Sequence, residues 1–325
     1  MDTVRWGILG TGSIAKKFAR GLQSLPDAEI AAVGSRSEEK AESFGNEFNV
    51  PRRHASYEAL CADRDVDIIY VATPHPLHCE NALLCLKKGK AVLCEKPFAV
   101  NARQAGRMIA KARAKGLFLM EGMWTRFFPL MAEVRRIQAE GDIGEIRMLE
   151  VDFGFRCGWN PESRLLNPAL AGGSLLDVGV YCNALAFMLF GKPDKIVSQA
   201  HIGATGVDEQ AAWVMKYPKG QIAVCSSAVQ TSTPMEATIS GTEGRIRIHG
   251  PWWIPQKMTV QRGGKVEDRE FPIEGNGMNY EAASVMACLR NGQTENPIIP
   301  LDETLEIART MDALRKQWGL KYPFE

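Results

Sequence analysis

Two groups of side chains in this 325-residue chain could act together in acid–base chemistry. Lys96, in Glu95-Lys96-Pro97, follows a short apolar stretch, where a lysine can put positive charge beside a developing alkoxide. Asp177 and Tyr181 are four residues apart in a helical pattern and so share one face. A tyrosine can take a hydroxyl proton if a cation such as Lys96 stabilises its phenolate, and Asp177 could position that lysine or a hydroxyl. Oxidation of an alcohol needs such a set.

Each of these residues also has a plainer interpretation. From its position alone, a lysine after a strand is more often a solvated side chain. Tyr181 alone would be interpreted as a half-buried helical aromatic. The paired glycines Gly172-Gly173 before the helix let the backbone approach a ligand closely, but they do not decide between these interpretations.

The N-terminus carries the turn Gly10-Thr11-Gly12-Ser13-Ile14-Ala15, which follows an apolar strand and opens a helix. That context is the one a dinucleotide-binding turn requires. Gly10 permits the tight turn, Gly12 lets the backbone approach a pyrophosphate, and Ala15 allows close packing of helix on strand. The helix N-terminus adds N–H donors and a positive dipole end. The alternative is a glycine turn that is purely structural.

The end of the second strand indicates which dinucleotide binds. An NAD site usually carries Asp or Glu there, to accept from the ribose 2′-OH. This chain has Gly34-Ser35-Arg36-Ser37, with Lys40 one turn later. Arg36 could stack on adenine and, with Ser35, contact a 2′-phosphate. We therefore expect NADP, with NAD as the alternative cofactor; a solvated arginine is the plainer interpretation.

The predicted strands and helices follow two different patterns along the chain. From Val4 to about Met123, short apolar runs alternate with helical stretches, which predicts a parallel, doubly wound α/β sheet. We expect strands at Val4–Leu9, Glu29–Gly34, Asp67–Thr73, Ala91–Cys94 and Leu117–Glu121, with helices at Ser13–Leu25, Pro76–Lys88 and Asn101–Lys115.

After Met123, strands follow one another without helices between them, which predicts an α+β domain on an open, mostly antiparallel sheet. The boundary is expected near Met123, giving domains 1–123 and 124–325. We expect strands at Arg147–Phe155, Lys195–Ile202, Glu209–Tyr217, Gln221–Ala228, Ala237–Ser240, Arg245–His249 and Lys257–Gln261, and helices at Pro129–Glu140, Ser174–Leu189, Tyr280–Arg290 and Asp302–Trp318.

Composition excludes several classes of partner. The formal net charge is +1, so nucleic acid and membrane surfaces are not expected as main partners. No apolar run reaches the roughly 20 residues of a transmembrane helix. The eight cysteines form no C-x-x-C pair, so reduced thiols in the cytoplasm are expected. His75 and His78 suggest no third ligand, and no metal is expected.

Other residues give weaker signals. Thr73 and Pro74 follow a strand and would line the nicotinamide side of the crevice. An irregular loop holds Arg156, Trp159 and Asn160, groups that polyol recognition would use, although it is also an ordinary loop. The pair Trp252-Trp253 could belong to a dimer surface or to the core.

In combination and order, four motifs resemble those of the glucose–fructose oxidoreductase/inositol dehydrogenase (Gfo/Idh/MocA) family, over nearly the whole chain. They are Gly10–Ala15, Ala72-Thr73-Pro74 with His78, Glu95-Lys96-Pro97, and Gly172–Tyr181. The resemblance implies a Rossmann domain plus an α/β domain whose open sheet commonly forms oligomer contacts. It also implies that the lysine of the E-K-P motif is catalytic.

Tyr181, where many members carry histidine, and the segment Glu121–Pro129 resemble the dimeric dihydrodiol dehydrogenase branch. This implies an NADP-dependent enzyme and homodimer acting on a sugar or trans-diol hydroxyl, with Lys96 and Tyr181 as catalytic pair and Asp177 supporting. The alternatives are an NADPH-dependent reductase of a sugar-like carbonyl and a non-catalytic dinucleotide sensor. Phe127, with Arg156, Trp159 and Asn160, is expected near the substrate; Phe127, Trp124 and Arg126 could equally pack between domains. The expected cofactor-binding residues are Gly10, Thr11, Gly12, Ser13, Ile14, Ser35, Arg36, Lys40, Thr73, Pro74, His78, Glu95, Lys96, Trp124 and Arg126.

Overall fold

The computed structural model describes residues 3–325, and the chain divides into two compact units. Unit 1 comprises Met1–Trp124 and Glu274–Leu305; unit 2 comprises Thr125–Ile273 and Glu306–Glu325. The first division lies next to the boundary expected near Met123. The segment 274–305, however, was expected in the second domain and belongs to unit 1.

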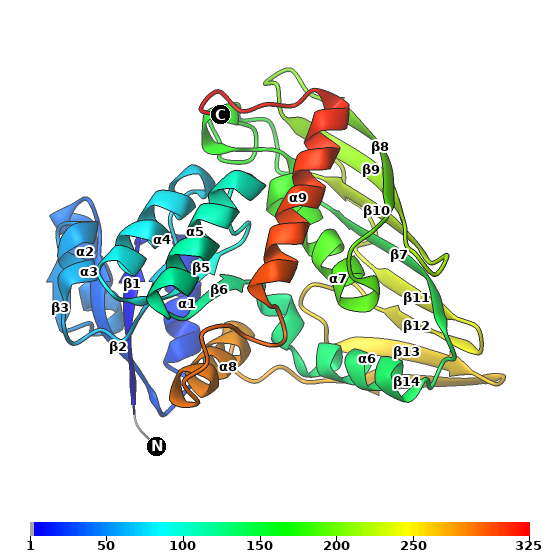
Figure 1. Cartoon of the computed structure of the whole chain (residues 1–325), viewed down its shortest axis with the longest axis horizontal. Coiled ribbons are helices and arrows are strands. Elements are labelled where there is room, and N and C mark those ends of the chain that lie inside the picture. The colour runs from blue at the N-terminus through cyan, green and yellow to red at the C-terminus, as the bar shows by residue number, and fades with distance from the viewer. Residues whose placement is uncertain (1–2) are drawn as a thin grey trace. The chain divides into compact units, whose positions relative to one another are not determined.

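In the described part of unit 1, six strands form a sheet in the order β3-β2-β1-β4-β5-β6, with every neighbouring pair parallel (Figure 1). The doubly wound parallel sheet is confirmed. Its central strands are buried along almost their whole length because helices cover both faces. The strands are β1 (Val4–Leu9), β2 (Ala28–Gly34), β3 (Arg52–His54), β4 (Ile68–Val71), β5 (Ala91–Glu95) and β6 (Leu119–Gly122).

The helices of unit 1 include one from late in the chain. Asn276, just before α8, donates from Nδ2 to the Lys17 carbonyl on α1 at 2.7 Å. A Cβ on Gly21 of α1 would lie 3.1 Å from the Asn279 nitrogen, so the two helices pack closely. The helical segments are α1 (Ser13–Leu22), α2 (Glu38–Phe48), α3 (Tyr57–Ala62), η1 (His75–Leu77), α4 (His78–Lys87), α5 (Ala102–Lys115) and α8 (Met278–Arg290).

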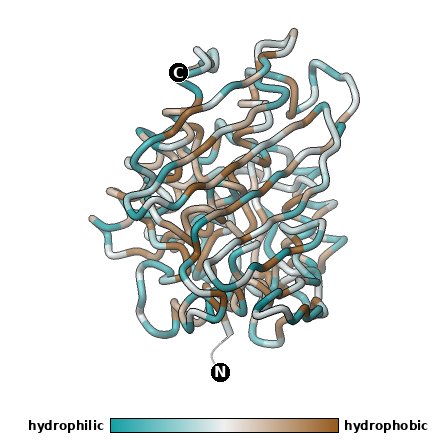
Figure 2. The backbone as a smooth tube through the Cα atoms, turned by 90° about the vertical axis from the view of Figure 1, so that its right-hand side faces the viewer, coloured by the Kyte–Doolittle hydropathy of each residue, from teal (hydrophilic) through white to brown (hydrophobic). Residues whose placement is uncertain are grey.

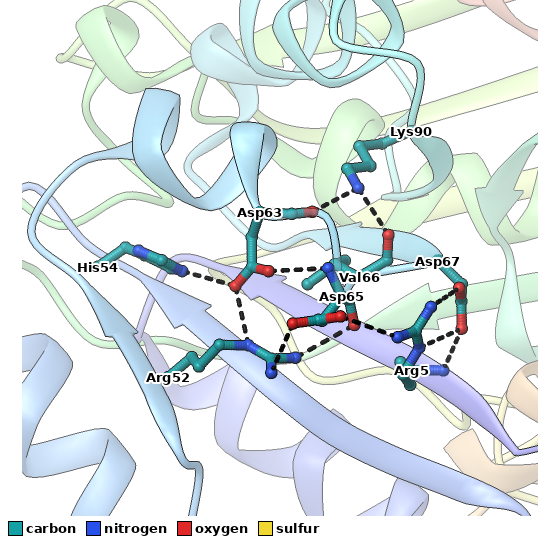
Figure 3. A network of polar contacts seen from close by, with 8 residues as sticks. All are labelled: Arg5, Arg52, His54, Asp63, Asp65, Val66, Asp67 and Lys90. Atoms are coloured by element: carbon teal, nitrogen blue, oxygen red, sulfur yellow. Dashed lines mark hydrogen bonds and ion pairs between the residues drawn. The ribbon is translucent and has the colours of Figure 1, made fainter.

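A polar network fixes the connection between α3 and β4 (Figure 3). Lys90 donates from Nζ to the carbonyls of Asp63 and Val66, at 2.5 and 2.7 Å. The Asp63 carboxylate lies 2.9 Å from both Arg52 Nε and His54 Nε2. The network's members serve the scaffold of unit 1; they are Arg5, Arg52, His54, Asp63, Asp65, Val66, Asp67 and Lys90.

In unit 2, all of whose residues are described, eight strands form a sheet in the order β14-β13-β12-β11-β7-β10-β9-β8 (Figure 1). Every neighbouring pair is antiparallel except β7 with β10, which runs parallel from Met148↔Ile222 to Gly154↔Ala228. The mostly antiparallel sheet is confirmed. Its strands are β7 (Ile146–Gly154), β8 (Lys195–Ile202), β9 (Asp208–Lys216), β10 (Ile222–Ala228), β11 (Ala237–Gly241), β12 (Gly244–Ile248), β13 (Lys257–Arg262) and β14 (Lys265–Glu270).

One face of this sheet packs on helices that include α6 (Pro129–Glu140) and α7 (Val180–Phe190) (Figure 1). The stretch Pro168–Phe190 is long and apolar enough to cross a membrane, yet 89% of its most apolar window is buried inside the protein. That burial identifies it as the core helix of unit 2. The 3₁₀ turn η3 (Pro168–Leu170) also belongs to unit 2. The 3₁₀ turn η2 (Trp124–Phe127) and the helix α9 (Leu301–Trp318) each begin in unit 1 and end in unit 2.

The opposite face of the sheet, which we call the open face, carries exposed apolar side chains among polar ones. Along the strands, brown and teal segments alternate (Figure 2). Val197 on β8 pairs with Val214 on β9, and Ile222 on β10 pairs with Met148 on β7. All four are more than a third exposed. They form two apolar cross-strand pairs, one on β8 and β9 and the other on β10 and β7.

Candidate active site

The glycine turn between β1 and α1 is shaped to receive an anion. Gly10 has φ +105°, and a Cβ there would lie 2.8 Å from the Ala72 carbonyl oxygen, so only glycine fits. A Cβ on Gly12 would meet nothing within 4 Å, which leaves open space beside the helix N-cap. No acidic residue occupies the first turn of α1, and Ala15 is fully buried against the sheet. Thr11 and Ile14 are half-buried, and Ser13 is exposed. A pyrophosphate fits this arrangement of backbone and helix dipole.

The residues after β2 present two cations at the carboxyl edge of the parallel sheet. Ser35 is buried, and its Oγ accepts from the Ser37 N–H at 3.3 Å. Ser37 caps α2 by accepting from the Lys40 N–H. Arg36 and Lys40 are both exposed. No carboxylate ends β2, and the next acids, Glu38 and Glu39, lie in the first turn of α2.

His78 joins the loops that follow β4 and β5. It is fully buried; Nε2 lies 2.7 Å from the Thr73 carbonyl oxygen and Nδ1 lies 2.8 Å from that of Pro97. Burial lowers the pKa of His78, although both carbonyl contacts oppose that shift. Asn81 holds the Thr73 hydroxyl at 3.1 Å, while Pro74 is exposed. His78 thus links Thr73 to the E-K-P loop, and its expected place beside the cofactor stays a prediction.

Glu95 and Lys96 come at the end of β5. The Glu95 carboxyl is buried; Oε1 accepts from the Tyr70 hydroxyl and Oε2 from the Lys96 backbone N–H at 3.1 Å. Burial raises the pKa of Glu95, while the Tyr70 hydrogen bond and the Lys96 charge oppose the rise. Glu95 therefore points into unit 1 and holds the backbone of Lys96, whose side chain is half-buried.

Trp124 closes unit 1 after β6. Its ring is buried, and the Lys17 ammonium lies over it at 4.1 Å from the centroid. Burial lowers the pKa of Lys17. A cation over an indole face is attracted by the ring quadrupole, so Lys17 fixes where Trp124 stands.

In unit 2, the expected helix Ser174–Leu189 is a π-helical turn, η4 (Leu175–Gly179), followed by α7. Asp177 lies in the π turn and is buried, with Arg164 Nη1 2.6 Å from its Oδ1. Tyr181 lies on the first turn of α7 and is 5% exposed. The four-residue spacing was interpreted as α-helical, and the wider turn changes how the two side chains align. Single π turns occur frequently at functional sites.

Asp208 on β9 anchors the start of that helical segment, a role that the sequence did not reveal. Its Oδ2 accepts from the Ser174 hydroxyl at 2.9 Å and from the Leu175 N–H at 2.7 Å. A Cβ on Gly173 would overlap Asp208 Oδ1, so this glycine makes room for the carboxylate. Burial raises the pKa of Asp208 to about 6. The carboxylate thus sits at the positive end of the segment that carries Asp177 and Tyr181.

An aromatic wall lies beside Tyr181. Phe153 at the end of β7 stacks on Trp253 at 3.7 Å between centroids and 18° between planes, and lies 5.5 Å from the Tyr181 ring. The Trp253 carbonyl accepts from Thr125 Oγ1 at 2.8 Å. Trp252, by contrast, is a core residue whose Nε1 donates to a backbone carbonyl of β7. The sequence left the tryptophans undecided and missed Phe153, because a phenylalanine ending a strand carries no distinctive signal.

Two expected site residues in unit 2 pack internally. Arg126 is 3% exposed; its guanidinium donates to the Ala184 carbonyl on α7, and its own carbonyl accepts from Arg135 Nη1 at 2.8 Å. It therefore braces α7 one turn beyond Tyr181. Phe127 is also buried.

The substrate-loop candidates are exposed. Arg156 forms an isolated bridge with Gln230, and Trp159 is 59% exposed. Asn160 is exposed, and its Oδ1 accepts from the Glu162 N–H. Their role in substrate recognition stays a prediction.

Comparison with known proteins agrees with this geometry. Residues 4–123 match the family model for an oxidoreductase family with an NAD-binding Rossmann fold, and residues 131–247 match the GFO/IDH/MocA C-terminal domain. The chain is 40% identical over 334 residues to a trans-1,2-dihydrobenzene-1,2-diol dehydrogenase from Mus musculus, covering 98% of each chain. The enzyme of that name from Homo sapiens is 40% identical over 337 residues, again covering 98% of both.

Solved structures are similar over the same span. An aldose-aldose oxidoreductase from Caulobacter crescentus, complexed with glycerol, has a TM-score of 0.90 at 28% identity, covering 98% of both chains. A 3-ketoreductase from Actinomadura kijaniata, complexed with NADP and TDP-benzene, has a TM-score of 0.86 at 27% identity, covering 97% of this chain and 98% of that one. The chain is an NAD(P)-binding enzyme that belongs to the Gfo/Idh/MocA oxidoreductase family.

Proposed function

We propose that this enzyme uses NADP to oxidise a hydroxyl of a sugar or of a cyclic trans-diol. The observation that carries the proposal is Tyr181, a buried phenol one turn from the ion-paired Asp177 and against the Phe153–Trp253 stack. The names of the relatives support it, since they are trans-dihydrodiol dehydrogenases and an aldose-aldose oxidoreductase.

In the proposed reaction, the substrate hydroxyl gives its proton to the Tyr181 phenolate oxygen. The dinucleotide, when bound, accepts the hydride that leaves the same carbon. Lys96 holds positive charge beside the developing alkoxide and favours the phenolate form of Tyr181. Asp177 orients the substrate hydroxyls. The Phe153–Trp253 stack offers an apolar face to a ring.

The decisive experiment follows NADPH absorbance against a panel of aldoses, polyols and trans-diols. We expect turnover with at least one class. Lys96→Met and Tyr181→Phe should each lower kcat by about 10²- to 10⁴-fold, as removal of a general acid–base group does. The dissociation constant of NADP, measured separately for both variants, should stay nearly unchanged. Wild-type turnover in either variant would remove that residue from the mechanism.

The two alternatives give other results in the same assay. A non-catalytic sensor would bind NADP and turn over no compound in the panel. A reductase working the other way would consume NADPH with a sugar-like carbonyl and show little oxidation of any hydroxyl. Either outcome would contradict the proposed direction of reaction.

NADP preference is proposed from Arg36 and Ser35 at the end of β2, and the NADP-bound 3-ketoreductase structure supports it. Arg36→Ala should lower kcat/KM for NADP by about 10- to 100-fold, the loss expected for a charge-assisted hydrogen bond. The value for NAD should change little. Equal loss with both cofactors, or a wild-type preference for NAD, would contradict the assignment.

We also propose a homodimer formed through the open face, because two cross-strand pairs, Val197 with Val214 and Ile222 with Met148, expose apolar surface there. Light scattering should give twice the chain mass, and Val214→Glu should convert the dimer to monomer. Unchanged mass in that variant would exclude this face. The eight free thiols fit a reducing compartment, and we keep the cytoplasm as the proposed location.

A further inference from the structure

Glu281 on α8 is a buried acid that the mechanism above does not use. Its side chain is fully buried in unit 1. Neither carboxyl oxygen has a hydrogen-bond partner among residues 3–325. An ionised carboxylate without partners in an apolar interior costs several kcal/mol, so such a group changes protonation state instead.

Three ionisable groups of unit 1 interact electrostatically with Glu281. They are Glu95 on β5, Lys17 on α1 and Tyr70 on β4. We call these four residues the acid cluster. Burial and then the Glu95 charge raise the pKa of Glu281, and only Lys17 opposes the rise. Cys94, next to Glu95, also faces the Tyr70 hydroxyl.

The two carboxyls of the acid cluster are not equivalent. Glu95 accepts hydrogen bonds from the Tyr70 hydroxyl and the Lys96 N–H, and both favour its ionised form. Glu281 accepts none. When two buried carboxyls interact and one proton is available, the proton resides on the group whose anion is less stabilised. That group is Glu281.

The charge on Glu281 matters because two of its neighbours, Glu95 and Lys17, contact residues of the proposed site. Glu95 holds the backbone of Lys96, and Lys17 lies over the Trp124 ring. An ionised Glu281 would attract the Lys17 ammonium and add a second negative charge that interacts with Glu95.

We propose that Glu281 is a positioning residue that stays protonated, leaving Glu95 as the one carboxylate of the acid cluster and Lys17 on the Trp124 ring. The inference rests on the proposed function to the extent that Lys96 and Trp124 serve the reaction. The first part of the proposal, that Glu281 is neutral, depends only on residues of unit 1 and not on the proposed reaction.

Infrared difference spectroscopy of the purified chain tests the neutral acid without any turnover. Wild type at pH 8 should show the carbonyl band of a protonated carboxylic acid, and Glu281→Gln should lose it. Glu274→Gln, in the exposed segment before α8, is the matched control and should keep the band. A band that survives Glu281→Gln, or a wild type without one at pH 8, would overturn the proposal. This outcome is independent of whether the enzyme oxidises any diol.

The pH dependence of kcat tests the positioning role. In wild type, ionisation of Glu281 should lower kcat at alkaline pH. Glu281→Gln mimics the neutral acid, so its kcat at neutral pH should be close to wild type and its alkaline decline should move up by about one pH unit or more. An unchanged profile, with the infrared result as expected, would leave a neutral acid that positions nothing and would refute this role. Lack of turnover in wild type itself would refute the proposed function instead.

Discussion

Each unit of this protein buries an acid near residues of the proposed site, and the hydrogen bonding of the two acids differs. Asp208 in unit 2 receives the Ser174 hydroxyl and the Leu175 N–H on one oxygen. Glu281 in unit 1 receives nothing among the described residues. Both are fully buried. Burial alone therefore does not tell what a buried acid does.

The difference lies in the groups that surround each carboxyl. Asp208 faces the N-terminal end of η4, where N–H groups need an acceptor, so its carboxyl oxygen serves the fold through the hydrogen bonds that it accepts. Glu281 interacts with another carboxyl, Glu95, and with Lys17, which Glu95 shares, so ionisation of Glu281 is unfavourable there. The first acid is a structural anchor for Asp177 and Tyr181. The second is a neutral group whose ionisation would disturb Lys17 and Glu95.

Removing the anchor should have the largest effect. Asp208→Ala leaves the Leu175 N–H buried without an acceptor, which should lower the free energy of unfolding of unit 2 by roughly 2–3 kcal/mol. Asp208→Asn keeps an acceptor and should lose about 1 kcal/mol or less. Denaturant unfolding of both variants measures this. Equal losses would mean that the charge, rather than the hydrogen bond, anchors the segment.

The pH dependence of stability should separate the two acids. Burial raises the pKa of Asp208 from 3.8 to about 6, so the native state holds that proton more tightly than the unfolded chain. Stability from this group is full below pH 3.8 and is lost as pH rises to about 6, by about 3 kcal/mol, then stays constant.

Burial and the Glu95 charge raise the pKa of Glu281 well above 4.5, so the stability that this group contributes should also be lost as pH rises, over a window of its own. The free energy of unfolding of wild type and of each amide variant should be measured from pH 4 to 9. The difference between the two curves gives the pH range over which each acid changes stability. Coincident windows for Asp208→Asn and Glu281→Gln would contradict the comparison.

Replacement of Glu281 should raise stability, whereas replacement of Asp208 lowers it. Glu281→Gln should stabilise the protein at pH 8 by about 1 kcal/mol, because the amide has no charge to lose in the apolar interior. The midpoint of thermal unfolding should rise relative to Glu274→Gln. A fall in the midpoint would show that the carboxyl makes a contact worth more than its burial costs.

The smallest effect is expected at a third acid, which lies between the two cases. Asp177 is buried, but its partner Arg164 has a side chain that is 60% exposed. Arg164→Met should change stability by less than about 1 kcal/mol, as for exposed ion pairs. It should raise KM a few-fold by loosening Asp177, while kcat changes less. A stability loss as large as that of Asp208→Ala would make Arg164 a second anchor.

The sequence predicted those elements whose pattern is local. Continuous apolar runs located β1, β4 and β5, and periodicity located α5 and α6 within a residue or two. The elements α2, α3, β3 and β14 were missed. Strand β3 has only three residues, all half-buried, and β14 is almost wholly exposed, so neither carries an apolar pattern. The caps Ser37 and Ser56 were available signals for α2 and α3.

The candidate site divides in the same way. Gly10, Gly12 and Lys96 could be proposed from the sequence because their motifs lie within a few consecutive residues. Asp208 and Glu281 could not be found, because nothing near them in sequence shows which N–H or carboxyl they meet across the fold. The π turn at Asp177 was likewise hidden, since its sequence is compatible with an ordinary helix.

The late helix α8 has a consequence for the order in which the chain is made. Unit 1 begins at the N-terminus, but the helix that packs on α1 and brings Glu281 is synthesised only after all of unit 2 up to Ile273. A nascent chain that ends near Trp124 would emerge from the ribosome with the α8 side of α1 uncovered and without the acid cluster. Domains that fold from the N-terminus as they emerge cannot finish this one early. The dinucleotide unit should therefore become stable late in synthesis, and a 1–123 fragment would make a poor stand-alone binding domain.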